Sequence, residues 1–209
     1  FNIPLNRIVV NHLGVHVHTA TSPALSSIEG PYILYVAQML PRRHARETIH
    51  AFERIAKDFP YHRLILVGRD KYHPPIIEQL VRDANARLGT DQIIHHTYIE
   101  SDDDLGNLFA HARLFVYISS SEAFGLPPVE AACQGVPVVV KEDPLNHELF
   151  DDAAFFVHNP QDTEEIASVM KRGLTDENQR NYCKQRYASL AERFTWKQFT
   201  ERFFTHVAS

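Results

Sequence analysis

The chain has 209 residues, of which 44% are hydrophobic and 22% charged, proportions typical of a globular protein. Its 21 Lys and Arg residues against 26 Asp and Glu give a net charge of −5, which excludes the strongly basic footprint of a nucleic-acid-binding protein. No apolar run approaches the roughly 20 residues that cross a bilayer. The two cysteines form no disulfide framework and the thirteen histidines no H-E-x-x-H pattern, so we expect a cytoplasmic protein without a metal site.

The predicted elements begin with an irregular part, residues 1–30. Within it, 7–10 is predicted as a short strand and 19–30, rich in Ser, Thr, Pro and Gly, as a loop. Apolar runs and helical patterns then alternate to the end of the chain. Strands are expected at 32–37, 63–67, 92–95, 114–118, 136–141 and 153–157. Helices are expected at 44–58, 76–88, 102–112, 127–134, 146–150 and from 163 to the end.

The strands read as continuous apolar runs without alternation, which is typical of strands covered on both faces. Together with the regular exchange of strand and helix, this predicts an α/β fold. We expect a Rossmann-like, doubly wound parallel sheet of about six strands with helices on both faces. Ligands of such sheets bind at the carboxyl ends of the strands, so the candidate site should lie there.

The stretch 119–135 (SSSEAFGLPPVEAACQG) follows one of these strands and contains the main candidate site. Pro127 and Pro128 suit the first positions of a helix, and Gly135 suits its end. The loop before the helix offers free amide groups to a ligand. These are the amides of Phe124, Gly125 and Leu126. Amides and helix dipole together predict an anion-binding site.

Two carboxylates accompany this site, Glu122 in the loop and Glu130 in what we predict to be the first turn of the helix. Carboxylates accept hydrogen bonds from hydroxyl groups, so the pair is suited to holding two ends of a polyhydroxylated ligand. Glu130 has a second interpretation, because acidic residues favour helix N-termini on electrostatic grounds alone.

The other strand ends supply further candidates. Arg42 and Arg43 follow the first sheet strand and suit bidentate contact with phosphate, although a solvated basic loop is the alternative. Gly68 and Arg69 end the second strand, where Gly68 permits close backbone approach and a plain turn is the alternative.

The segment from Glu122 to Val139 (EAFGLPPVEAACQGVPVV) resembles the E-x7-E signature of family 4 retaining glycosyltransferases with the GT-B fold. The resemblance extends from about residue 7 to the C-terminus and corresponds to the C-terminal nucleotide-sugar-binding domain, glycosyl transferases group 1. The sequence departs from the usual family pattern at four positions. These are Ala37, Gln38, Arg43 and Thr97, where many members have Gly, Arg, Lys and Gly.

The resemblance implies a role for each candidate residue. Glu130 would hold the ribose and Glu122, the catalytic residue, the sugar hydroxyls, with the two arginines and the loop amides on the diphosphate. Tyr98 and Ile99 would lie at the base. The full implied donor-binding set is Arg42, Arg43, Gly68, Arg69, Tyr98, Ile99, Glu122, Ala123, Phe124, Gly125, Leu126 and Glu130.

The resemblance also implies a domain organisation. Residues 1–30 would be the interdomain linker and the segment that enters the domain, and residues 31–209 the donor-binding domain with its C-terminal helix. Because the chain begins with Phe1, we expect it to be an excised fragment that lacks the N-terminal acceptor domain. An apolar helical face in the tail would pack on the domain or mediate self-association. Its residues are Trp196, Phe199, Phe203, Phe204 and Val207.

The implied activity is transfer of a hexosyl group from a nucleotide diphosphate sugar to an acceptor hydroxyl, in surface polysaccharide or glycoconjugate synthesis. The basic first loop favours GDP-mannose as donor, with a UDP-sugar as the alternative, and no cofactor is expected. We expect the isolated fragment to be inactive, and the intact protein to be cytoplasmic, associated with the inner face of the membrane through the missing half. Two other functions remain open: a nucleotide-sugar epimerase of the same fold, and a non-catalytic nucleotide-binding module.

Overall fold

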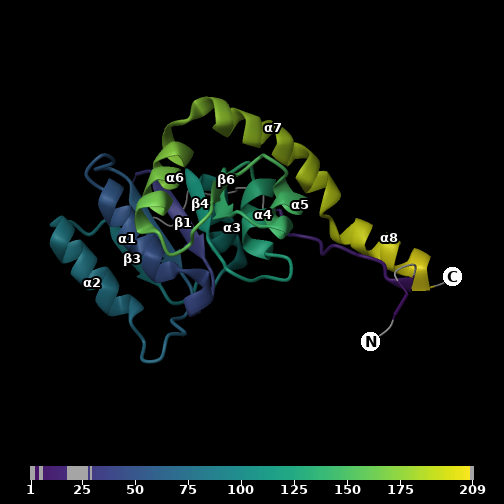
Figure 1. Cartoon of the computed structure of the whole chain (residues 1–209), viewed down its shortest axis with the longest axis horizontal. Coiled ribbons are helices and arrows are strands. Elements are labelled where there is room, and N and C mark those ends of the chain that lie inside the picture. Colours follow the sequence, from purple (N-terminus) through teal and green to yellow (C-terminus); the bar gives the residue numbers. More distant parts are fainter. Residues whose placement is uncertain (1–2, 5–6, 18–27, 29, 208–209) are drawn as a thin grey trace.

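The computed structural model describes residues 3–4, 7–17, 28 and 30–207. It contains a six-stranded, wholly parallel sheet in the order β3-β2-β1-β4-β5-β6, which confirms the predicted α/β fold (Figure 1). The strands are β1 (Tyr32–Val36), β2 (Arg63–Val67), β3 (Ile93–His96), β4 (Leu114–Tyr117), β5 (Val138–Lys141) and β6 (Phe155–Val157). The strand order reverses between β1 and β4, so the loops after these two strands lie beside each other at the carboxyl edge of the sheet.

Helices cover both faces of the sheet. The helix α1 packs against α2 and α6, whereas α4 packs against α3 and α7. Right-handed crossovers place these two groups on opposite faces. The helices are α1 (Ala45–Ile55), α2 (Ile77–Leu88), α3 (Asp102–His111), α4 (Leu126–Cys133), α5 (Pro144–Phe150), α6 (Thr163–Thr175), α7 (Glu177–Arg193) and α8 (Trp196–Val207), with a short 3-10 helix η2 (Pro41–Arg43).

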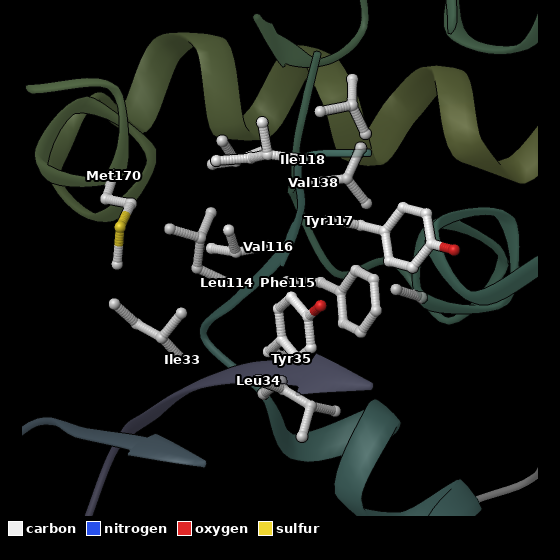
Figure 2. Close-up of a cluster of buried hydrophobic side chains, with 14 of the residues drawn as sticks. Ile33, Leu34, Tyr35, Leu114, Phe115, Val116, Tyr117, Ile118, Val138 and Met170 are labelled. Carbon is white, nitrogen blue, oxygen red and sulfur yellow. The ribbon is translucent and has the colours of Figure 1, made fainter. Parts of the chain in front are cut away.

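The core lies around the two central strands. Every residue of β4 is buried, and so are the first four of β1. Figure 2 shows their side chains on both sides of the sheet: Phe115 and Tyr117 lie on one side, and Val116 lies on the other, toward Met170 of α6. Burying such side chains contributes roughly 1.5–3 kcal/mol each. Because strands buried on both faces need no polar side, these runs are apolar throughout, as the sequence predicted.

The predicted strand at 7–10 is wrong. Arg7 lies in a 3-10 turn, and residues 8–17 have no regular secondary structure. The segment instead runs along the start of α8, where the Val15 amide donates to the Phe194 carbonyl over 2.9 Å and Asn11 Nδ2 donates to the Phe199 carbonyl over 3.0 Å. Its apolar residues have the composition of a strand, but the described part of the segment pairs with no strand of the sheet.

The helical tail is confirmed as helical, but it forms three helices rather than one. Side-chain caps explain the breaks. Asp176 accepts a hydrogen bond from the Gln179 amide over 3.0 Å, and Thr195 Oγ1 accepts one from the Gln198 amide over 3.1 Å. Such local hydrogen bonds favour the start of a new helix over continuation of the old one.

The last helix, α8, lies with the segment 8–17 to one side of the sheet domain (Figure 1). The two are in close contact, since a Cβ atom added to Gly14 would lie 2.3 Å from the backbone nitrogen of Trp196. None of the α8 side chains is buried, and Phe204 is 61% exposed. Self-association through this face stays a prediction. No helix of the described chain is long and apolar enough to span a membrane.

Arg180 of α7 is an exception to the apolar core, because its side chain is only 2% exposed. Its Nη1 donates to the carbonyl of Arg113 over 3.0 Å and to the carbonyl of Gly173. Burial and the nearby Arg113 lower its pKa. The guanidinium thus joins the end of α6, the start of α7 and the turn before β4.

We predict that Arg180→Ala lowers the free energy of unfolding by about 3 kcal/mol, because the carbonyls of Arg113 and Gly173 lose a charged donor and a cavity remains. Chemical denaturation measures the change. Arg186→Ala on the same helix is the control. Arg186 is half exposed, with Asp151 at 3.5 Å, so its loss should cost less than about 0.5 kcal/mol. Equal losses in the two variants would contradict a special role for Arg180.

Candidate functional site at the carboxyl edge of the sheet

The candidate site is built from the loops after β1 and β4. The Ser120 amide donates to the Arg42 carbonyl over 2.8 Å, and Tyr35 of β1 donates its hydroxyl to the Arg43 carbonyl over 3.1 Å. The two loops, 79 residues apart at Arg43 and Glu122, therefore form one unit. Adjacent parallel strands bring their carboxyl ends to the same edge, and this produces the contact.

The Glu122 carboxylate is the most strongly bonded group of this unit. Its Oε1 accepts hydrogen bonds from Arg43 Nε over 2.8 Å, Tyr117 Oη over 2.8 Å and Ser119 Oγ over 2.9 Å. Burial opposes ionisation, but the bonds from Arg43, Tyr117 and Ser119 outweigh it and hold the pKa of Glu122 below its ordinary value of 4.5. The carboxylate is therefore charged and fixed in orientation.

The second carboxylate oxygen of Glu122 is much freer. Among the described residues its one partner is Arg43 Nη2, at a long 3.5 Å. The carboxylate borders a small pocket between β4, the start of α4 and the start of α5. The pocket is lined by Tyr117, Ser119, Glu122, Phe124, Gly125, Pro128, Asp143, Leu145 and Asn146. Oε2 is consequently the acceptor that remains for a hydroxyl group of a ligand.

The start of α4 supplies the hydrogen-bond donors that the sequence predicted. Gly125 has a φ of 81° at the N-cap, a left-handed conformation that glycine adopts without strain. The amides of residues 121–126 donate to no described group, and the two prolines that follow have no amide hydrogen. Free amides at the positive end of a helix dipole attract an anion.

Glu130 lies one position later than predicted, because α4 begins at Leu126 and Glu130 therefore opens the second turn. The extra residue comes from Leu126, which joins the helix ahead of the prolines. Burial raises the pKa of Glu130, partly offset by His16. No described residue donates a hydrogen bond to its carboxylate, which leaves both oxygens for a ligand. This environment differs from that of Glu122 and does not fit a simple helix-dipole role.

The two arginines of the first loop also differ. Arg43 is half-buried, and its guanidinium pairs with Glu122 and lies 5.7 Å above the ring of Tyr117. Arg42 is exposed, and its side chain has no hydrogen-bonded or ionic partner among the described residues. From the sequence, both arginines are expected to contact phosphate. In the structure, the guanidinium of Arg42 is available to a ligand, whereas that of Arg43 is already paired with the Glu122 carboxylate.

The remaining predicted residues lie at the ends of β2 and β3. Gly68 has a φ of 138°, and an added Cβ would lie 1.8 Å from the carbonyl oxygen of Ala37, so only glycine fits between the first two strands. Arg69 is exposed, and its carbonyl accepts from the Met39 amide over 2.9 Å. Tyr98 is exposed and Ile99 half-buried beyond β3. Ala123 is exposed in the β4 loop.

Ser119 and His44 lie in loops that the sequence marked as candidates, but neither their side chains nor that of Tyr117 had a predicted role. Tyr117 and Ser119 bond Glu122, and His44 bonds Ser120. Their position at the ends of β1 and β4 was a usable signal, because polar residues directly after buried strands converge at one edge.

Asp70, which follows β2 at the same edge, stabilises the loop that leads to α2. Its carboxylate accepts hydrogen bonds from the amides of Tyr72, Ile76 and Ile77 over 2.8, 2.6 and 2.8 Å. Since these bonds cap the start of α2, the role of Asp70 is structural.

Fold and site together define a Rossmann-like domain with a loop of free amides and two carboxylates at its carboxyl edge. Residues 22–189 match the family described as glycosyl transferases group 1, and the chain belongs to this family. Within the described part of the chain, no group of three or more His, Cys, Asp and Glu side chains is arranged to hold a metal ion.

Two curated relatives are mannosyltransferases. The O-antigen chain mannosyltransferase B of Escherichia coli is 30% identical over 210 residues, covering 96% of this chain and 54% of the relative. The GDP-mannose:cellobiosyl-diphosphopolyprenol alpha-mannosyltransferase of Xanthomonas oryzae pv. oryzae is 26% identical, covering 94% of this chain and 51% of the relative. The chain thus spans about half the length of each.

A solved structure, described as trehalose-6-phosphate from E. coli bound with UDP-2-fluoro glucose, aligns with a TM-score of 0.77. It covers 92% of this chain and 50% of that chain at 14% sequence identity. At this identity the likeness concerns the fold alone, which is the Rossmann-like half of a GT-B structure.

The pKa of Glu122 leads to a prediction about stability and pH. Because the folded-state pKa is below 4.5, the charge of Glu122 stabilises the fold fully above that pH, and the contribution is lost as the pH falls through the folded-state pKa. Glu122→Gln should therefore be less stable than the wild type near pH 7, with the difference shrinking as the pH falls below 4.5.

Denaturant unfolding at a series of pH values provides the measurement. Glu192→Gln is the matched control, because Glu192 is exposed and forms no ion pair with a described residue. The difference in stability between Glu192→Gln and the wild type should not change with pH in this way. A stability difference for Glu122→Gln that stays constant across the range would mean that the carboxylate charge contributes nothing to the fold.

Proposed function

We propose that this chain is the donor-binding domain of a retaining glycosyltransferase that takes a hexosyl group from a nucleotide diphosphate sugar. The observation that carries the proposal is the arrangement around α4. Its start has free amides, Glu122 is held in one orientation in the loop before it, and Glu130, one turn into the helix, has no hydrogen-bond partner among the described residues. These three features match the three polar parts of a nucleotide sugar, namely diphosphate, sugar and ribose.

In this proposal the diphosphate binds at the amides of residues 124–126, and the exposed guanidinium of Arg42 adds a positive charge. Negative charge accumulates on the diphosphate as its bond to the sugar breaks. Preorganised amides, a helix dipole and arginine stabilise that charge without reorganisation. Arg43 can contact the diphosphate only if its guanidinium moves away from Glu122 or bonds both groups at once. Its contribution to donor affinity therefore depends on whether the ion pair with Glu122 separates.

Glu122 holds the sugar in this proposal. Its Oε1 is saturated by three donors, whereas Oε2 is free to accept from a sugar hydroxyl. A carboxylate that is already ionised and fixed loses little entropy when it binds. Holding the sugar in one orientation increases the fraction of bound donor in reactive geometry.

The proposed donor is GDP-mannose, with a UDP-sugar as the alternative. The basic loop at Arg42 and Arg43 supports this choice, and so do the names of the curated relatives, two of which are mannosyltransferases and one of which specifies GDP-mannose. No cofactor is proposed.

The acceptor would bind to a domain beyond this chain. This is consistent with the chain spanning about half of the relatives. By analogy with the O-antigen mannosyltransferase, the intact protein would act in surface polysaccharide synthesis at the cytoplasmic face of the membrane. The domain alone should bind donor yet transfer almost nothing, because binding without a positioned acceptor gives little rate.

The proposal predicts different effects for the two carboxylates. Glu130→Gln should weaken binding of GDP and of GDP-mannose alike, each by about 10-fold, because the ribose loses a charged acceptor. Glu122→Gln should leave the affinity for GDP unchanged or raise it, because Arg43 loses its ion pair and can contact the phosphate. The same variant should bind GDP-mannose no more tightly than GDP, because the contact with the mannose is lost. Isothermal titration calorimetry of each variant with both ligands measures the difference.

The control is again Glu192→Gln, which should bind both ligands as the wild type does. Melting temperatures distinguish lost binding from lost folding. If both site variants bind GDP and GDP-mannose normally, the carboxylates have no part in donor binding. If the wild-type chain binds UDP-glucose but not GDP-mannose, the assignment of the donor is wrong and the site itself is retained.

A further inference from the structure

His44 has an unusual backbone and an unusual environment. It directly follows Arg43, and its φ of 52° places a residue with a side chain in the left-handed region. Three backbone contacts hold it there: its amide donates to the Pro41 carbonyl over 3.2 Å, and its carbonyl accepts from the Thr48 amide and hydroxyl, both over 2.9 Å. A strained residue held by its surroundings next to a binding loop indicates a function for its conformation.

The imidazole of His44 lies between two side chains. Its Nε2 is 2.6 Å from Ser120 Oγ, and its Nδ1 faces Glu47 Oε2 at 3.6 Å. The ring and the carboxylate are inside the protein, since His44 and Glu47 are each 6% exposed. Neither Nδ1 nor Oε2 has another hydrogen-bond partner in the described chain, so the two buried atoms are directed at each other.

Glu47 is ionised in this position. Burial opposes its charge, but the imidazole of His44 and the hydrogen bonds from Arg46 outweigh burial and lower the pKa of Glu47 to about 2. Arg46 Nη2 lies 2.6 Å from its other oxygen. A carboxylate beside Nδ1 favours the tautomer with a hydrogen on that atom. Nε2 is then an acceptor, and the Ser120 hydroxyl donates to it.

We propose that His44 is a positioning residue for donor binding, which fixes the loop of Arg42 and Arg43 against the loop of Glu122 through its bond to Ser120. The identity of the ligand rests on the proposed function, but the contacts between the two loops are present without a ligand. The Ser120 amide also bonds the Arg42 carbonyl, so one residue of the β4 loop is held at two points of the β1 loop. Arg43 lies between these two points of the β1 loop, and Glu122 follows Ser120 by two residues.

Two variants test the proposal. Ser120→Ala removes the hydroxyl from an exposed residue and should fold normally. His44→Asn removes the ring but keeps a residue that tolerates the left-handed conformation. Each should weaken GDP binding by about 3- to 10-fold, the effect of one lost hydrogen bond. The double variant should be no weaker than the single ones, because both changes remove the same contact.

A second readout requires no ligand. When the loops separate, Arg43 moves away from Glu122, so the pKa of Glu122 measured by NMR titration should rise in both variants. Ser121→Ala is the matched control. Ser121 is the neighbouring exposed serine, and its hydroxyl bonds no described residue, so this variant should bind GDP and titrate as the wild type does.

The outcomes separate this proposal from the proposed function. If the wild-type chain binds neither GDP nor GDP-mannose, the proposed function fails, and the Glu122 titration alone decides whether His44 positions the loops. If Ser120→Ala and His44→Asn leave the Glu122 pKa unchanged, or if Ser121→Ala changes it equally, the proposal is overturned. A raised pKa with unchanged GDP affinity in wild-type-like folds also contradicts a role in donor binding.

Discussion

The ion pair between Arg43 and Glu122 is the contact on which the site depends. It joins two loops that are adjacent only because β1 and β4 are neighbours in a parallel sheet. The pair is half-buried, where an unpartnered charge would be costly, so each group keeps the other in place. Tyr117 and Ser119 complete the hydrogen bonds of the carboxylate, which explains why both polar side chains lie at the end of an otherwise apolar strand.

Two glutamates eight positions apart are held in opposite electrostatic environments. Glu122 has three strong donors and a lowered pKa, whereas Glu130 is desolvated, accepts no hydrogen bond from a described residue and has a raised pKa. A binding partner would satisfy Glu130 but would have to share Glu122 with Arg43. The Glu130 carboxylate is an acceptor without a described donor, whereas the Glu122 carboxylate is already ionised and held in one orientation. This difference is difficult to explain by helix stabilisation, which would treat the two carboxylates alike.

Much of the fold could be predicted from the sequence, because continuous apolar runs, proline at helix starts and glycine at helix ends act locally. The six strands and the loop before α4 followed from these signals. The error at 7–10 arose because an apolar run forms a strand only where it pairs with another strand, and this segment lies along α8 instead. The partnership of Arg43 with Glu122, and of His44 with Ser120, spans more than seventy residues. No rule of residue spacing predicts such contacts, because they result from the order of the strands, which places β1 beside β4.

The most direct test is a crystal structure of this chain with GDP-mannose bound. We predict that diphosphate oxygens accept hydrogen bonds from the amides of residues 124–126, that the ribose contacts Glu130 and that a mannose hydroxyl donates to Glu122. A nucleotide sugar bound away from the start of α4, for example in the hollow between α2 and Tyr98, would contradict the proposed site.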